Sequence, residues 1–109
     1  MPDLRGLTII IVGPDPDRFA AALTLASASA ALGGPTRLFA DERAVPLLRR
    51  GGPHASRIDE ARALGASVVA CQTGLAGAGL TPADLVEEVE MGGLVGLLAT
   101  LGDARLVTV

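Results

Sequence analysis

Apolar and polar positions along the chain form blocks that predict strands separated by helices. LTIIIVG, residues 7–13, is a continuous apolar run rich in β-branched side chains, which is typical of a buried strand. TRLFA (36–40) and SVVAC (67–71) have the same character. A short fourth strand is expected within VEEVEMGG (86–93), and RLVTV (105–109) predicts a fifth.

Helical periodicity fills the intervals between these runs. Asp15 suits the N-cap of a first helix, Pro16 its first position, and Gly33 with Gly34 its end. Further helices are expected in ERAVPLLRR, with Pro46 in the first turn, in RIDEARALGA, closed by Gly65, and in GLVGLLATLG. GGPHAS (51–56) is predicted to be a loop, QTGLAGAG (72–79) a turn with short helical character, and TPADL (81–85) a further capped turn.

The alternation of strands and helices predicts a single α/β domain over residues 1–109, with a parallel sheet covered by helices on both faces. In such folds the functional site lies beyond the carboxyl ends of the strands. Two segments satisfy that requirement: Gly13–Pro14 after the first strand, and Cys71–Gln72–Thr73 after the third. We therefore expect the site at one of these places.

Composition narrows the function classes. Half of the 109 residues are apolar, and the net charge is -3 with no basic run, so nucleic-acid binding is not expected. No apolar stretch approaches the ~20 residues that span a bilayer, and the N-terminus lacks a signal-peptide pattern, so a cytoplasmic protein without a membrane segment is expected. All nine basic residues are arginines, which excludes a Walker-type lysine and a Schiff base.

Cys71 is the only cysteine in the chain, and its position favours a chemical role for its thiol. A free cysteine in an apolar run is commonly a small buried side chain. Cys71, however, ends its strand and precedes the polar and flexible residues Gln72, Thr73 and Gly74. Backbone amides at the start of a helix stabilise a thiolate, and glycine lets the backbone approach a sulfur closely. Both interpretations therefore remain open from the residues alone.

The remaining residues restrict what such a thiol can do. No second cysteine can resolve a disulfide, and His54, the only histidine, is expected to be an exposed loop residue. One cysteine and one histidine do not make a structural zinc site. A sulfur carrier needs neither partner in its own chain. The alternatives are a non-catalytic binding or assembly module with a structural Cys71, and a pocket for a small anion or nucleotide.

The order of motifs resembles the DsrE/DsrF-like family of small sulfur-relay proteins. In that family a cysteine sits after a central strand and before a glycine-containing turn, and a later Val-x-x-Gly-Gly segment opens an apolar helix. Cys71 and Val89-Glu90-Met91-Gly92-Gly93 correspond to these features. The opening segment, residues 7–33, looks like the family's first strand and helix. The resemblance covers nearly the whole chain, although only the cysteine carries chemistry.

The resemblance implies a three-layer α/β/α fold with a mostly parallel five-stranded sheet, and homotrimers or hexamers. It implies a persulfide that is formed on Cys71 and transferred onward, with a sulfur donor or acceptor protein as partner. No cofactor and no metal are expected. The expected substrate-binding residues around Cys71 are Gly13, Pro14, Gln72, Thr73, Gly74, Gly92 and Gly93. The acidic cluster of Glu87, Glu88 and Glu90 is interpreted as solvated surface, with Glu90 as an alternative acid–base group.

Overall fold

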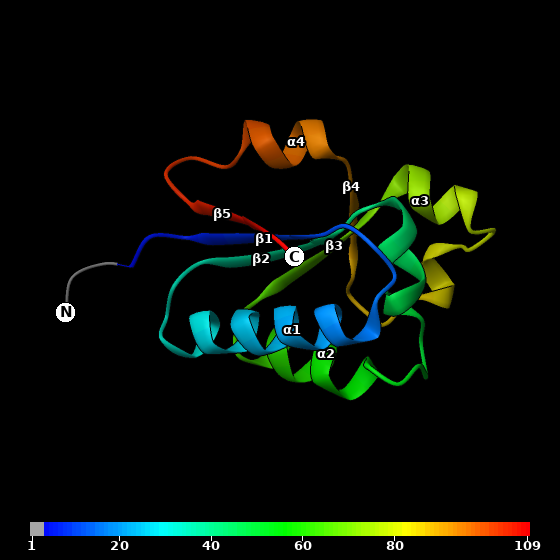
Figure 1. The fold of residues 1–109 in the computed structure, drawn as a ribbon, viewed down its shortest axis with the longest axis horizontal. Coiled ribbons are helices and arrows are strands. Elements are labelled where there is room, and N and C mark those ends of the chain that lie inside the picture. Colours follow the sequence, from blue (N-terminus) through cyan, green and yellow to red (C-terminus); the bar gives the residue numbers. More distant parts are fainter. Residues whose placement is uncertain (1–3) are drawn as a thin grey trace.

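The apolar runs of the sequence form the strands of one parallel sheet in the computed structural model, which describes residues 4–109. The strand order is β4-β3-β2-β1-β5, and every pairing is parallel (Figure 1). The elements in chain order are β1 (Leu7–Ile11), α1 (Pro16–Ala31), β2 (Thr36–Ala40), the 3₁₀ helix η1 (Glu42–Leu48), α2 (Ala55–Ala63), β3 (Ser67–Cys71), α3 (Gln72–Gly77), the 3₁₀ turn η2 (Pro82–Asp84), β4 (Glu90–Gly92), α4 (Leu94–Ala99) and β5 (Arg105–Thr108). The five-stranded α/β/α architecture expected from the sequence is confirmed, and the sheet is parallel throughout.

The strand order explains why helices cover both faces. The chain steps from β1 to β2 to β3 in one direction, and right-handed crossovers then place α1 and α2 on the same face. After β4 the chain returns across the whole sheet to β5, so α4 lies on the opposite face (Figure 1). The short helix α3 follows β3 directly and lies near the carboxyl ends of the strands. Three layers result.

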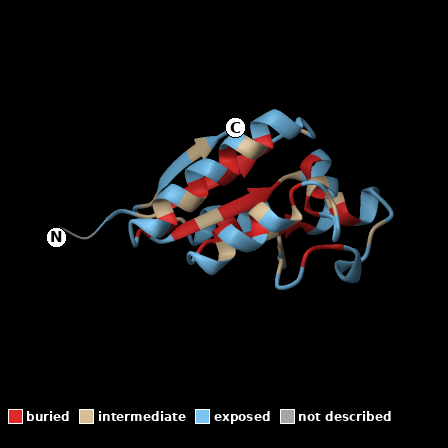
Figure 2. Cartoon of the chain, turned by 90° about the horizontal axis from the view of Figure 1, so that it is seen from below, coloured by how far each residue is buried: buried red, intermediate tan, exposed pale blue. Residues whose placement is uncertain are grey.

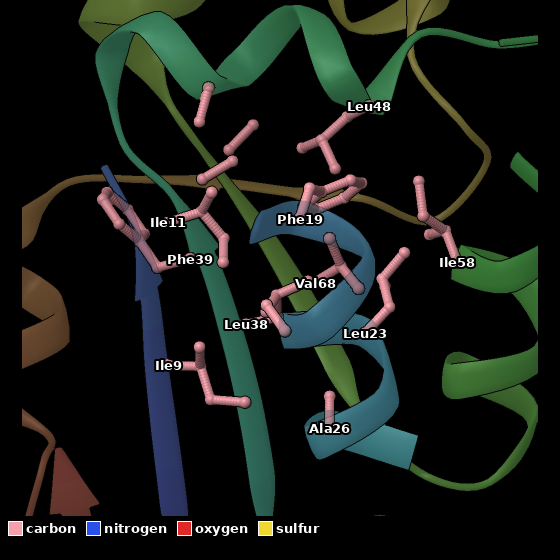
Figure 3. Packing of buried hydrophobic residues seen from close by; sticks show 14 of the residues in the cluster. Ile9, Ile11, Phe19, Leu23, Ala26, Leu38, Phe39, Leu48, Ile58 and Val68 are labelled. Carbon is pink, nitrogen blue, oxygen red and sulfur yellow. The ribbon is translucent and has the colours of Figure 1, made fainter. Parts of the chain in front are cut away.

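The core lies between the sheet and the pair of helices α1 and α2. Figure 3 shows Phe19 and Leu23 of α1 packed over Leu38 of β2 and Val68 of β3, with Ile58 of α2 beside them. All five of these side chains are buried. Burying a side chain of this size stabilises a fold by about 1.5–3 kcal/mol, so this layer supplies much of the driving force for folding. The buried stripe of α1 is visible in Figure 2.

The first helix begins as its sequence predicts. The Asp15 side chain accepts hydrogen bonds from the backbone amides of Asp17 and Arg18, and Pro16 occupies the first helical position. The segment at Glu42–Leu48 differs from the expectation, because it is a 3₁₀ helix with Pro46 inside rather than in its first turn. Proline has no amide hydrogen to donate, which disfavours a regular α-helical ladder there. The expected loop 51–56 is shorter, since α2 already begins at Ala55.

Candidate functional site

Cys71 stands at the carboxyl end of β3, as its place in the sequence predicts. It is the last residue of the strand, and α3 begins with the next residue, Gln72. Across the sheet it is in register with Gly92 of β4. Side chains alternate along a strand, so Cys71 shares a face with Val69, while Val68 packs under α1 on the other face. The thiol therefore belongs to the face that α4 covers.

The surroundings of Cys71 are largely apolar. The residue is only 7% exposed and belongs to the hydrophobic core. Among residues 4–109 no side-chain hydrogen bond joins its sulfur to a carboxylate, an imidazole or a hydroxyl group. Within this part of the chain, no general base is therefore hydrogen-bonded to the thiol. Any reaction at this sulfur has to draw on the backbone around it and on a reagent small enough to reach it.

A cleft lies beside the strand ends, between η1 and α3. Its volume is about 490 Å³. The lining residues come from the β1–α1 turn, from η1 and from α3: Pro14, Glu42, Arg43, Pro46, Thr73, Gly74, Gly77 and Ala78. The cleft wall is mostly backbone and small apolar groups, with one carboxylate, one guanidinium and one hydroxyl at the polar positions. Such a surface suits a small molecule that carries a charged group.

The absence of a side chain at Gly74 allows α3 to pack directly against η1 beside this cleft. A Cβ atom at Gly74 would lie 2.5 Å from the carbonyl oxygen of Glu42 and 2.6 Å from its Cα. Both are backbone atoms that cannot move aside without shifting η1. The glycine therefore fixes how closely α3 approaches η1, and with it the shape of the cleft.

A second, smaller cleft lies under α4. It has a volume of about 170 Å³ and is lined by Arg37, Val69, Gly92, Gly93, Gly96, Leu97 and Thr100. Arg37 projects from β2 toward α4, where its guanidinium donates to the carbonyl oxygens of Leu97 at 3.2 Å and Thr100 at 3.3 Å. It also donates to the hydroxyl oxygens of Thr100 at 2.7 Å and Thr8 at 3.3 Å. A cation at the end of α4 complements the partial negative charge of the last carbonyl groups.

The residues singled out from the sequence fall into two groups around Cys71. Pro14, Thr73 and Gly74 line the cleft between η1 and α3. Gly92 and Gly93 line the cleft under α4. Cys71, Gly13 and Gln72 line neither of these two clefts. Gly13 is partly exposed at the end of β1, and the side chain of Gln72 points into solvent at the start of α3.

Sequence reasoning did not single out Arg37, Glu42 or Arg43. Arg37 could have been identified from the sequence, because a charged residue inside the apolar strand TRLFA needs polar partners on the face to which it points. Glu42 and Arg43 carried none, since a charged pair at the start of a surface helix is ordinary. Only the folded chain shows that both face Thr73 across the cleft.

The expectation that His54 is an exposed loop residue is wrong. His54 is only 9% exposed, and its ring packs edge-on against Phe19 with the ring centroids 4.9 Å apart. Phe19 belongs to the core on the α1 face of the sheet, whereas Cys71 points to the opposite face. The histidine is therefore a packing residue at the start of α2. It does not serve Cys71 as a base.

The acidic cluster pairs with arginines at the surface. Glu87 contacts Arg50 at 3.4 Å, and Glu88 pairs with Arg62, which also contacts Asp59 at 3.3 Å. Glu87, Glu88 and Glu90 are all exposed, which agrees with the interpretation as solvated surface. Glu90 lies two residues before Gly92 along β4, at the end of the strand remote from Cys71. The described residues 4–109 contain no cluster of three side chains suited to a metal ion.

Together these features define a small parallel α/β protein with one cysteine at the carboxyl edge of its sheet and two clefts beside it. Within residues 4–109, no helix has the length and apolar character that a bilayer crossing requires. No protein-family model and no curated protein sequence matches the chain.

Solved structures share the fold. The chain is similar to MTH1491 from Methanobacterium thermoautotrophicum, a protein of unknown function, with 19% identity and a TM-score of 0.86 over 97% of this chain and 100% of that one. It is similar to the ychN protein from E. coli with 25% identity and a TM-score of 0.86 over the same shares. BT1422 from Bacteroides thetaiotaomicron, also of unknown function, follows with 16% identity and a TM-score of 0.68 over 94% of each chain. These similarities establish the fold.

Proposed function

We propose that this protein is a sulfur carrier of the DsrE/DsrF-like kind that holds a transferable sulfur atom on Cys71. The observation that carries the proposal is the position of Cys71 at the last residue of the interior strand β3, immediately before α3. Ligands of open α/β sheets bind at this edge. The resemblance of the cysteine and Gly-Gly segments to sulfur-relay proteins supports the same assignment. A thiol needs a reducing compartment to stay free, so we place the protein in the cytoplasm.

The transfer of a sulfur atom to Cys71 requires no oxidant. The Cys71 thiolate attacks the outer sulfur of a persulfide donor, RS–SH. A new S–S bond forms at Cys71, the S–S bond of the donor breaks, and the donor leaves as RS⁻ while its proton stays on the transferred sulfur. With thiosulfate the leaving group is sulfite. The persulfide on Cys71 then passes the sulfur to an acceptor thiolate by the same exchange in reverse.

The cleft between η1 and α3 supplies groups for an anionic donor. Arg43 stands at its rim, and the described residues 4–109 offer its guanidinium no ion-pair partner. The Thr73 hydroxyl faces the same space. In the proposal, Arg43 attracts the charged end of the donor while the sulfane sulfur reaches toward Cys71. Replacing Arg43 by Met should then weaken loading from thiosulfate more than loading from an alkyl persulfide RS–SH whose R group carries no charge.

Intact-mass analysis tests the proposal directly. The protein is incubated with thiosulfate or with a persulfide donor, desalted, and compared with a Cys71→Ser variant treated in parallel. We expect the wild type to gain the mass of one sulfur atom, a gain that reduction with a thiol removes, and the variant to gain nothing. An unchanged wild-type mass, or an equal gain in Cys71→Ser, would exclude a persulfide at this residue.

Burial of Cys71 favours a second candidate function, a non-catalytic assembly module in which the thiol is structural. A residue that is 7% exposed within the core is typical of a cysteine that serves only packing. Thiol labelling separates the two functions. A sulfur carrier should react with a small reagent such as iodoacetamide in the native state. A structural thiol should react only after the chain is unfolded in denaturant.

We also propose self-association through the outer face of α4, in keeping with the trimers or hexamers that the resemblance implies. Val95 is 86% exposed, and Leu94 and Leu98 of the same helix are exposed as well. Contiguous exposed apolar side chains commonly mark an interface. Sedimentation of the wild type and of Val95→Glu tests this: the wild type should sediment as an oligomer and the variant as a smaller species. A monomeric wild type would contradict it.

A further inference from the structure

Strand β5 forms an open edge of the sheet, with unpaired backbone groups along its outer side. It pairs only with β1, with Leu7 opposite Arg105 and Ile9 opposite Val107. The amides of Arg105 and Val109 donate to carbonyl oxygens of residues 6 and 10. Amides alternate in direction along a strand, so those of Leu106 and Thr108 point away from β1. No further strand of the described residues takes them up.

This edge is short and carries the exposed Arg105, but it lacks several other features that usually protect an edge strand. Natural edge strands are shielded by proline, by a bulge, by inward-pointing charges or by a covering helix. The sequence of residues 105–109 is RLVTV. These residues are mostly β-branched or apolar, and none is a proline. Leu106 is 45% exposed on one side of β5. The other edge of the sheet, β4, is only three residues long. The open edge at β5 is therefore the one suited to strand addition.

An apolar groove runs beside β5 on the α1 face of the sheet. Helix α1 covers β1 and β2 but stops short of the edge strand β5, whose residues are exposed or partly exposed (Figure 2). The groove has a volume of about 320 Å³. Its lining joins the start of the chain, one side of α1 and β5: Leu4, Arg5, Leu7, Leu25, Ala28, Ser29, Leu32, Gly34, Arg105 and Val107. A strand added to β5 would place alternate side chains into this groove.

The charge of the groove indicates which kind of incoming strand it would bind. Arg5 and Arg105 line it, and none of the lining residues within 4–109 carries a carboxylate. The Nε atom of Arg5 donates to the carbonyl oxygen of Asp103 at 2.9 Å, which orients the guanidinium without neutralising it. Neither arginine forms an ion pair within residues 4–109. Opposite charges across neighbouring strands are stabilising, so a carboxylate of the incoming segment should face these arginines.

We propose that β5 and the groove beside it bind an extended segment of another protein that carries acidic and β-branched residues, added to the sheet as a sixth strand. The outward amides of Leu106 and Thr108 supply the main-chain hydrogen bonds. Arg5 and Arg105 select acidic side chains, and the groove takes an apolar one. The same strand of a second copy fits less well, because residues 105–109 read RLVTV and contain no aspartate or glutamate to face Arg5 and Arg105.

Titration with a synthetic peptide tests the proposal on the full chain. The probe is a short capped peptide of alternating glutamate, valine and threonine, observed by its effect on backbone amide resonances. We expect shifts concentrated at Leu106 and Thr108, and slower hydrogen exchange at those two amides. A peptide methylated at the pairing amide nitrogens is the matched control and should leave both resonances unchanged.

Charge reversal provides the decisive comparison. Arg105→Glu should weaken binding of the acidic peptide roughly fivefold, the scale of one surface ion pair, and should strengthen binding of the same peptide with lysine in place of glutamate. Leu106→Pro removes an outward amide at a position where an edge strand tolerates proline, and should abolish binding while a thermal melt confirms folding.

Equal binding of acidic and basic peptides, or no shift at millimolar peptide, would overturn the proposal. Concentration-dependent self-association that Leu106→Pro abolishes would also overturn it and assign the edge to a second copy.

Discussion

Gly74 of α3 lies directly against the backbone of Glu42 in η1, so close that a Cβ atom at Gly74 would be 2.5 Å from the Glu42 carbonyl oxygen. The two residues are far apart in sequence and belong to helices that follow different strands, β3 and β2. Their contact brings Thr73 and Arg43 to opposite walls of one cleft. The glycine is therefore a structural requirement of the candidate site.

Gly74→Ala should separate α3 from η1 and destabilise the protein. Overpacking against backbone costs about 1–3 kcal/mol, and we expect a loss of unfolding free energy in that range by urea denaturation. Gly77→Ala is the matched control on the same helix, because a Cβ there meets no atom within 4 Å. Alanine is the better helix former by up to about 1 kcal/mol, so the control should be neutral or slightly stabilising. Equal losses in both variants would contradict the contact.

Arg37 holds α4 on the sheet through hydrogen bonds to the Leu97 and Thr100 carbonyl groups. Arg37→Met keeps much of the side-chain volume but removes every donor. Hydrogen bonds of charged groups contribute roughly 1.5–3 kcal/mol, and we expect a loss of that order together with faster hydrogen exchange in α4. Arg43→Met, which changes an arginine with no ion-pair partner among the described residues, should leave stability within about 0.5 kcal/mol of the wild type. Unaltered exchange in α4 would refute the role of Arg37.

Gly92 of β4 lies beside Cys71 of β3 as its register partner. A Cβ at Gly92 would stand on the same face as the thiol and 3.0 Å from a methyl carbon of Val69. Gly92→Ala should therefore slow alkylation of Cys71 in the native protein and cost about 1 kcal/mol of stability. Gly93→Ala is the control, because its Cβ meets open space and its φ of -145° suits any residue. If both variants react as fast as the wild type, the β4 side is not the route to the thiol.

Asp84 closes the 3₁₀ turn that begins at Thr81. Its carboxylate accepts from the Thr81 amide at 2.8 Å and from the Thr81 hydroxyl at 3.1 Å, and these two hydrogen bonds lower the pKa of Asp84 below its usual value. The ionised form is thus favoured in the folded state. Its stabilising effect is complete above the ordinary carboxyl pKa and is lost as pH falls through the lowered pKa.

Titration of the Asp84 carboxyl carbon by NMR should show that depressed pKa. Thr81→Ala removes the hydroxyl donor but keeps the amide, so the pKa of Asp84 should rise part of the way toward its usual value. Asp84→Asn should make the stability of this turn independent of acid pH, as followed by exchange of the Thr81 amide. An ordinary pKa for Asp84 in the wild type would show that the capping hydrogen bonds do not persist in solution.

Local sequence signals were sufficient for most of the elements. The runs 36–40 and 67–71 form strands with the expected bounds, Asp15 caps the first helix as expected, and the Asp84 carboxylate accepts from the Thr81 amide in the expected capped turn. Pro46 was misplaced within its helix, because the helix is of the 3₁₀ type and its start depends on contacts with β2 and α3. His54 was misjudged because a loop histidine becomes a core residue only when α1 brings Phe19 against it.

The sequence by itself determined the alternation of strands and helices and the position of Cys71 at a strand end, because periodicity, caps and glycine punctuation are local properties. Only the tertiary structure decided which strands are neighbours, and it left β5 as an open edge. It also placed Gly92 in register with Cys71, and it brought Arg43 and Thr73 to the same cleft. Those relationships depend on side-by-side packing of segments distant in sequence, and no local pattern encodes the order in which parallel strands assemble.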